Sequence, residues 1–169
     1  MTLNLDTPRL SLTPLQESDF DLFYQMLTDP FIRKYLCDDE VYGKDIIQNL
    51  LDSSLQTFSK DNYGLWLLSE KTSGKRIGFA GLRTFFEEPQ PQLIYALWKD
   101  YTGKGYAKEA SERIIEYSFD QLKYSYLIAS CDLPNLASQK VALSLGMKLM
   151  KKDEKDGLPT LYYKIENHE

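Results

Sequence analysis

The segment LIYALWKDYTGKGYAKEASERIIEYSFDQL, residues 93–122, decides the fold because it joins an apolar stretch, a glycine-containing turn and a helical pattern. Leu93–Trp98 predicts a strand, Tyr101–Tyr106 a turn, and a helix is expected from Ala107. The two glycines of the turn let a ligand approach the main chain closely. The helix behind them begins with N–H groups that lack intrahelical partners, and its dipole favours negative charge. This order predicts an anion site, most often for a phosphate.

Two common phosphate-binding patterns do not fit this turn. A Walker loop needs Gly-x-x-x-x-Gly-Lys-Ser/Thr, which does not occur, and a dinucleotide fingerprint needs a small residue where Lys108 stands. The pattern Gln/Arg-x-x-Gly-x-Gly/Ala fits better, since TGKGYA matches it at Gly105 and Ala107 and departs from it at Thr102. That pattern is the pyrophosphate loop of the GNAT superfamily of acetyl-CoA-dependent N-acetyltransferases, which this segment resembles.

The flanking sequence narrows the resemblance. IYALWKDYTGKGYAKEA is similar to the ribosomal-protein acetyltransferase (RimJ/RimL-like) branch, as is the opening pattern Thr-x-Arg-Leu-x-Leu. A second motif, DLPNLASQKVALSLGM at residues 132–147, resembles the family's Asn-x-x-Ser…Leu-Gly-Phe segment, with Met147 in place of Phe. From the residues alone, Asn135 is an N-cap and Ser138 the third helical residue, an arrangement that needs no ligand.

The resemblance implies acetyl-CoA as cosubstrate and assigns it two sets of residues. The implied cofactor-binding residues are Leu97, Trp98, Thr102, Gly103, Lys104, Gly105, Tyr106, Ala107, Asn135 and Ser138. The loop would hold the pyrophosphate, while Asn135 and Ser138 would lie beside the pantetheine arm. Two readings stay open: Lys104 could equally point to water, and the ring of Trp98 is expected to anchor the core or the loop rather than stack on a base.

The implied reaction is direct attack of a neutral amine on the acetyl thioester. A backbone amide near Leu97 is the candidate for stabilising the oxyanion. Many GNAT enzymes place an acidic tyrosine where this chain has Ala142, so Ser138 remains as the candidate acid. Tyr95 could order a water for proton removal, or Glu87 or Glu88 could act from the preceding loop. The competing interpretations are packing for Tyr95 and solvated loop charges for the two glutamates.

Composition limits the alternatives. The 169 residues suit one acetyltransferase domain, 1–169, and a net charge of −5 argues against unspecific nucleic-acid binding. Two cysteines and one histidine give no disulfide framework and no metal site, so we expect no metal. The sequence shows neither a membrane span nor a secretion signal, and a cytoplasmic monomer or homodimer is expected.

The order of predicted elements is that of an α+β protein. Strands are expected at Thr7–Leu15, Tyr63–Glu70, Arg76–Phe86, Leu93–Trp98, Tyr126–Asp132, Lys148–Lys155 and Thr160–Ile165, and helices at Ser18–Leu27, Phe31–Cys37, Lys44–Lys60 and Leu136–Leu145 as well as from Ala107. Gly78 and Gly81 predict a bulge or a close backbone approach. The resemblance implies a GNAT-like mixed, mostly antiparallel sheet of about seven strands, with helices on both faces and splayed at the fourth and fifth strands.

Three functions compete. The first is an N-acetyltransferase for a primary amine, most simply a protein N-terminal α-amine, with small amines, polyamines and aminoglycosides as alternatives. The second is a non-catalytic acyl-CoA-binding regulatory module, suggested by Ala142 in place of the acidic tyrosine. The third is a nucleotide-binding protein that uses the glycine loop, which predicts stabilisation by ATP or NAD rather than CoA.

Overall fold

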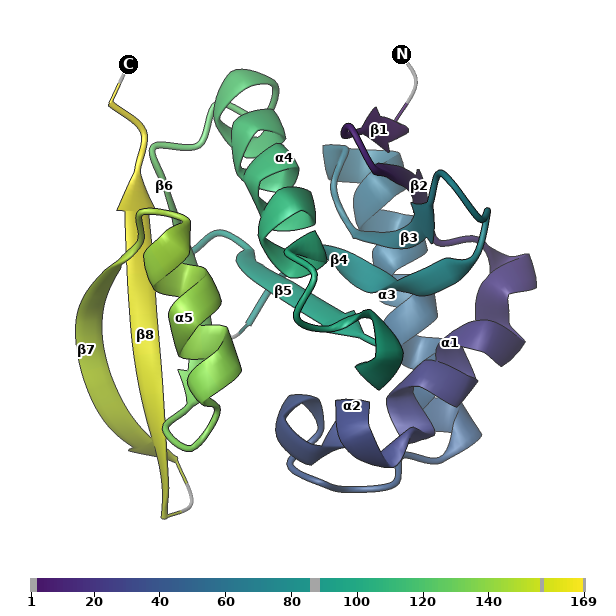
Figure 1. Cartoon of the computed structure of the whole chain (residues 1–169), viewed down its shortest axis with the longest axis horizontal. Helices are drawn as coiled ribbons and strands as arrows, with labels where there is room; N and C mark the ends of the chain where they lie inside the picture. Colours follow the sequence, from purple (N-terminus) through teal and green to yellow (C-terminus); the bar gives the residue numbers. More distant parts are fainter. Residues whose placement is uncertain (1–2, 86–88, 156, 169) are drawn as a thin grey trace.

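The computed structural model describes residues 3–85, 89–155 and 157–168 and has α+β architecture (Figure 1). The helices are α1 (Phe20–Thr28), α2 (Pro30–Leu36), α3 (Lys44–Asp61), α4 (Tyr106–Asp120) and α5 (Leu136–Ser144), with short 3-10 turns η1 (Glu17–Asp19) and η2 (Lys99–Tyr101). The strands are β1 (Leu5–Asp6), β2 (Leu10–Pro14), β3 (Leu65–Glu70), β4 (Arg76–Arg83), β5 (Gln92–Leu97), β6 (Tyr126–Asp132), β7 (Lys148–Lys155) and β8 (Leu158–Glu166).

The strands form two antiparallel sheets rather than one mixed sheet. The larger sheet has the order β1-β2-β3-β4-β5, and the smaller has the order β6-β8-β7. The sheets meet where β5 and β6 face each other, and there the Ser130 hydroxyl donates a hydrogen bond to Gln92 Oε1 at 3.1 Å. No backbone pairing joins β5 to β6 in the described residues, so the parallel pair that would make the sheet mixed is missing. The splay of one continuous sheet stays a prediction.

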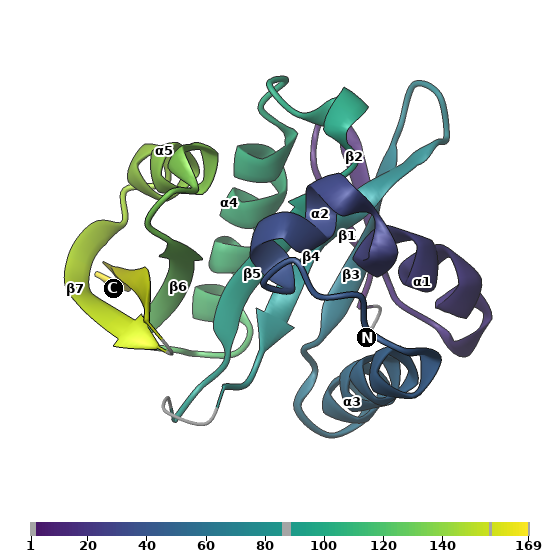
Figure 2. The same cartoon turned by 90° about the horizontal axis from the view of Figure 1, so that it is seen from below.

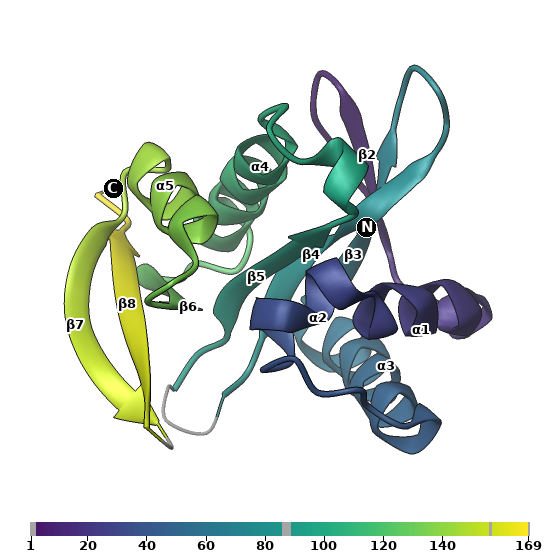
Figure 3. The same ribbon diagram turned by 60° about the horizontal axis from the view of Figure 1, so that its bottom comes forward.

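Helices cover both faces of the larger sheet (Figures 2 and 3). On one face α4 packs against β2, β4 and β5, and its own residues Ala110 and Ile114 are fully buried against the sheet. On the other face α1, α2 and α3 build a second core around Phe23, Leu51 and Phe79. The edge strand β5 therefore separates two apolar layers, and side chains at successive positions of this strand face different layers.

The glycines of β4 allow the close backbone approach that the sequence predicts. A Cβ atom at Gly78 would lie 2.0 Å from the Ala96 carbonyl oxygen, and one at Gly81 would lie 2.1 Å from the Gly64 carbonyl oxygen. The pairing of β3 with β4 also shifts at Leu68, next to Gly78. Both the irregularity and the close approach are thus present in this strand.

Several element boundaries differ from the prediction for local reasons. The first predicted strand starts later because Thr7 turns the chain, its N–H donating to the Leu10 carbonyl at 2.9 Å. Ser18 lies inside η1 and does not cap a long helix, since α1 starts at Phe20. Helix α4 begins at Tyr106, one residue earlier than predicted.

Candidate active site

A cleft of about 420 Å³ opens between β5 of the larger sheet and β6 of the smaller one. Helix α2 and helix α5 contribute further walls. The structure brings five of the predicted site residues to this cleft: Tyr95, Leu97, Thr102, Asn135 and Ser138. The two sequence motifs, which lie apart in the chain, therefore meet on opposite sides of one space.

The edge of β5 presents backbone groups to the cleft. Trp98 N–H donates to the Ile77 carbonyl at 2.9 Å, so the backbone amide of Trp98 points toward β4. Because adjacent residues of a strand direct their N–H groups to opposite sides, Leu97 and Tyr95 direct theirs toward β6. An extended ligand lying in the cleft could pair with this edge, as a peptide pairs with an open strand.

The predicted phosphate loop turns at its two glycines. Gly103 has φ +76° and Gly105 has φ +81°, the left-handed region that glycine adopts without strain. Gly105 is the N-cap of α4, and no described side chain caps this helix end. A Cβ atom at Gly103 would meet nothing within 4 Å, so the main chain is open to a ligand there. The first amides of α4 are thus available to an anion.

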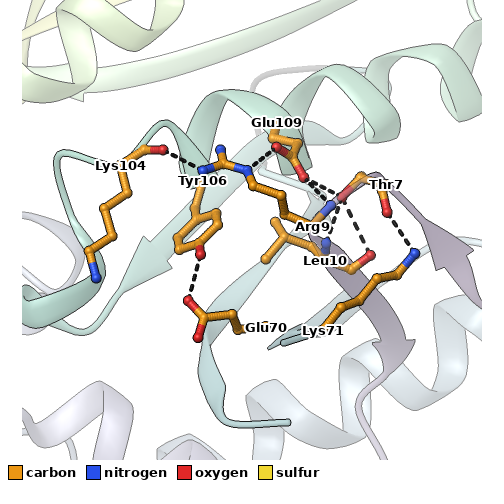
Figure 4. A network of polar contacts seen from close by, with 8 residues as sticks. All are labelled: Thr7, Arg9, Leu10, Glu70, Lys71, Lys104, Tyr106 and Glu109. Atoms are coloured by element: carbon orange, nitrogen blue, oxygen red, sulfur yellow. Dashed lines mark hydrogen bonds and ion pairs between the residues drawn. The ribbon is translucent and has the colours of Figure 1, made fainter. Parts of the chain in front are cut away.

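Side chains of the turn before β2 and of α4 hold this loop from behind (Figure 4). Arg9 Nη1 donates to the Lys104 carbonyl at 2.9 Å, and Arg9 Nε pairs with Glu109 Oε1 at 2.7 Å. The Arg9 guanidinium also stacks on the Tyr106 ring, 4.3 Å from its centroid. Glu109 Oε2 accepts from the Thr7 hydroxyl at 2.5 Å and from the Arg9 N–H at 3.0 Å. We call Thr7, Arg9, Tyr106 and Glu109 the loop support.

The loop support decides which parts of Tyr106 and Lys104 can meet a ligand. The Tyr106 hydroxyl donates to Glu70 at 2.5 Å, so its ring is committed to the protein and only its backbone is left for an anion. The Lys104 ammonium lies 5.3 Å from the Tyr101 ring centroid on the exposed side. The Thr102 hydroxyl donates to the Lys99 carbonyl at 2.6 Å and stabilises the entry to the turn.

The two predicted catalytic residues lie together. Burial raises the pKa of Tyr95 to about 12, and a hydrogen bond with the Ser138 side chain opposes part of that rise. Tyr95 therefore keeps its proton at neutral pH. Asn135 Oδ1 accepts from the Ser138 N–H at 3.2 Å and so fixes Ser138 in the first turn of α5, as the sequence predicts for an N-cap.

One acidic residue of the cleft was missed in the sequence analysis. Asp132 ends β6 and lines the cleft, and burial together with the nearby charge of Asp38 raises its pKa. Its position at the end of a strand, as the first residue of the second motif, was the available signal. The alternative bases, Glu87 and Glu88, lie outside the described residues. Cys131 is also at the cleft, and burial raises the pKa of its thiol to about 11, so it is a neutral thiol.

Three further observations bear on the predictions. Trp98 is partly buried against the core beneath α1 and α3, which agrees with an anchoring role for its ring. Ala142 is buried in α5 and lines the cleft where the family's tyrosine is missing. Among the described residues there is no group of three His, Cys, Asp or Glu side chains able to hold a metal, and no helix is long and apolar enough to cross a membrane.

Comparison with known proteins identifies the family. A protein-family model described as "Acetyltransferase (GNAT) domain" matches residues 9–148. An uncharacterized N-acetyltransferase of Bacillus licheniformis is 28% identical over 165 residues, which cover 95% of this chain and 87% of the relative. YnaD, an uncharacterized N-acetyltransferase of Bacillus subtilis, is 23% identical over 146 residues, which cover 86% of this chain and 83% of YnaD.

Solved structures share the fold. An acetyltransferase from Agrobacterium tumefaciens has a TM-score of 0.85 at 23% identity, covering 97% of this chain and 94% of that one. RimL, a ribosomal-protein α-N-acetyltransferase in complex with coenzyme A, has a TM-score of 0.79 at 14% identity, covering 95% of each chain. With the family match extending over most of its length, the chain belongs to the GNAT family of N-acetyltransferases.

Proposed function

We propose that the whole chain, residues 1–169, acts as one domain that transfers the acetyl group of acetyl-CoA to a primary amine. The amine attacks the thioester directly while both substrates are bound. The observation that carries the proposal is the meeting of the two motifs at one cleft, with the glycine turn at its end and Tyr95 beside Ser138.

The free first turn of α4 supports binding of the coenzyme A diphosphate. Backbone amides at a helix N-terminus bind phosphate well, and here no described side chain occupies them. The amides of Tyr95 and Leu97 would pair with the pantetheine arm and orient the thioester. In that arrangement the Leu97 amide is the donor for the oxyanion, because it already points into the cleft.

Tyr95 and Ser138 are proposed to act on the leaving group. A tyrosine whose pKa is about 12 stays protonated beside a thiolate, whose ordinary pKa is about 8.5. Full proton transfer from Tyr95 would be uphill, so its contribution is a hydrogen bond that stabilises the thiolate sulfur. The Ser138 hydroxyl lines the cleft beside Tyr95 and is proposed to relay a proton from solvent.

Asp132 is proposed to accept the proton of the incoming ammonium. It lines the same cleft, and its raised pKa makes its carboxylate a better base than an exposed aspartate. The nearby Asp38 adds negative charge that attracts a cationic amine. An Asp132→Asn variant should lose most activity near neutral pH and recover part of it at alkaline pH, where the amine is neutral on its own.

The acceptor is proposed to be a protein N-terminal α-amine. This rests on the resemblance of the two motifs to the RimJ/RimL-like branch and on the shared fold with RimL. Small amines, polyamines and aminoglycosides are the alternative acceptors. Residues of α2 such as Phe31 and Tyr35, which line the acceptor side of the cleft, will decide between them.

The test is release of free CoA from acetyl-CoA across a panel of amines that includes peptides. We expect turnover with at least one class, lowered at least tenfold by Ser138→Ala. A buried Ala142 in place of an acid favours the competing function of a non-catalytic CoA-binding module. Thermal stabilisation by CoA without turnover for any amine would establish that module instead.

A further inference from the structure

A second cavity lies on the other face of the larger sheet, beneath α1 and α3. Its volume is about 180 Å³, and its walls include Phe23, Leu50 and Phe79. At about 30 Å³ per water, this space would hold about six waters or an organic group of similar size. The space opens to solvent beside Arg83 and Thr84, and most of its walls are apolar side chains, which suits a small organic group.

This cavity adjoins the active-site cleft. Leu36, Phe85 and Ile94 contribute to the walls of both spaces. Ile94 belongs to β5, whose edge faces the cleft, and it packs with the core beneath α1 and α3. A molecule bound in the cleft can therefore extend around the edge of β5 into the cavity.

The cavity has one charged residue among the described side chains that line it, Arg83. Its guanidinium lies over Phe85, 5.1 Å from the ring centroid, and forms no ion pair within the described chain. The groups that act on its charge are Tyr42 and Cys37, and the pKa of each is raised by burial, so both are neutral at pH 7. Arg83 is thus an exposed cation at the rim of an apolar space, with no acidic partner among the described residues that line it.

We propose that this cavity is a subsite for the amine acceptor, and that it takes an apolar chain carrying a carboxylate that pairs with Arg83. The inference rests on the proposed acetyl transfer and adds the chemical class of the acceptor. The apolar walls favour burial of a hydrocarbon chain, and a guanidinium pairs with a carboxylate through two parallel hydrogen bonds. Polyamines and aminoglycosides carry only positive charges, which Arg83 repels.

The strand register sets the length of the acceptor. Tyr95 pairs with Ala80, whereas Arg83 lies three residues further along β4 and pairs with Gln92. Three residues of strand span about 10 Å. The amine and the carboxylate should therefore be separated by at least about 10 Å, since the acceptor also has to pass around the edge of β5. Asp132 at one end and Arg83 at the other would select the two charges in that order.

Two sources can supply this chemistry, and one experiment separates them. Initial acetylation rates are measured for ω-amino carboxylates of increasing length beside their amides, and for peptides that carry Glu or Gln after a free N-terminal residue. We expect the carboxylate form to have a KM about tenfold lower than its amide in one of the two series, since one charge-assisted pair at a partly exposed site contributes that much. The series that shows the difference identifies the source.

Variants of Arg83 assign the effect to this residue. Arg83→Gln should abolish the difference between carboxylate and amide, and Arg83→Lys should restore part of it. Arg76→Gln is the matched control, because Arg76 lies on the same strand and pairs with Asp19 at 3.6 Å, away from the cavity. Equal KM values for both forms in the wild type, or an equal change for both in Arg83→Gln, would overturn the subsite.

A binding measurement keeps the subsite testable if no amine is acetylated. Octanoate should raise the melting temperature of the wild-type protein and of Arg76→Gln but not of Arg83→Gln. Absence of this stabilisation would refute the subsite alone. If no amine is acetylated, neutral amines included, the proposed reaction is refuted. The octanoate measurement then still tests the subsite independently.

Discussion

The loop support leads to a sharp prediction about Arg9. This side chain joins the start of β2 to the turn before α4, through the Lys104 carbonyl and Glu109. Two substitutions separate its contributions. Arg9→Lys keeps the charge but loses the fork that reaches both partners at once, and Arg9→Met keeps much of the apolar stem but loses both polar contacts.

The magnitudes follow from the contacts. The hydrogen bond from the guanidinium to the Lys104 carbonyl is worth about 1 kcal/mol at a side chain that is 44% exposed, and its loss weakens CoA binding about fivefold. The ion pair with Glu109 adds up to about 1 kcal/mol, since Glu109 is 18% exposed and Arg9 more so. Arg9→Met should then weaken CoA binding by about 30-fold if the whole effect reaches the loop.

The assay is calorimetric titration with two ligands. CoA carries the diphosphate, whereas pantetheine lacks it but would bind the same strand edge in the proposed arrangement. We expect Arg9→Met to lose affinity for CoA but to keep its affinity for pantetheine, because the loop support contacts only the turn proposed to bind the diphosphate. Arg113→Met is the control, since Arg113 forms a comparable ion pair with Glu116 on the same helix, at 3.7 Å.

Two results would refute this reasoning. If Arg9→Met binds CoA like the wild type while its melting temperature falls, the loop support stabilises the fold and has no effect on the ligand. If CoA and pantetheine lose affinity equally, the change reaches the whole cleft, and the diphosphate is not held at this turn.

Three further predictions address stability and chemistry. Gly78→Ala should cost at least about 3 kcal/mol of unfolding free energy in urea titration, because its Cβ would lie 2.0 Å from the Ala96 carbonyl oxygen; a wild-type midpoint would contradict this. Tyr95→Phe should lower kcat about tenfold or more with little change in CoA affinity, and adding Ser138→Ala should cost less than the product of the single effects, since the two are bonded. Burial raises the pKa of Glu109, but hydrogen bonds from Thr7 and Arg9 outweigh this effect and leave the pKa below the usual 4.5. The ionised Glu109 therefore stabilises the folded protein above pH 4.5, and this stabilisation is lost as the pH falls through the folded pKa. Glu109→Gln should therefore lose less stability than the wild type between about pH 5 and pH 3, and parallel pH curves would exclude this account.

Local sequence patterns predicted most elements because their signals are local. The strands Tyr126–Asp132 and Lys148–Lys155 match to the residue, since alternation ends at turn-forming residues on each side. Helix α3 and helix α5 match within one residue at each end. The division into two sheets was not predictable in this way, because it depends on which strands pair across long distances in the chain.

The same distinction applies to the candidate site. The glycine turn and the N-cap residue Asn135 were recognisable because each motif is continuous in sequence. The loop support was not, since Arg9 and Glu109 are separated by 100 positions, and either residue alone reads as an exposed charge. Asp132 and Arg83 were missed for a similar reason. Only the folded structure shows that Asp132 lines the cleft and that Arg83 lines the neighbouring cavity.

In the proposed arrangement, β5 lies between a large anionic cofactor and an acceptor that carries both an amine and a carboxylate. The proposed diphosphate site is the start of α4, which packs on one face of the larger sheet, and Arg83 lines the cavity on the other face. Two anionic groups bound on the same face would compete for the same cations and repel each other across a low-dielectric space. In the proposed arrangement the two anionic groups lie on opposite faces of the sheet, and the thioester and the amine would meet at the edge of β5. Tyr95 belongs to this strand, so the proposed reaction would take place beside its side chain.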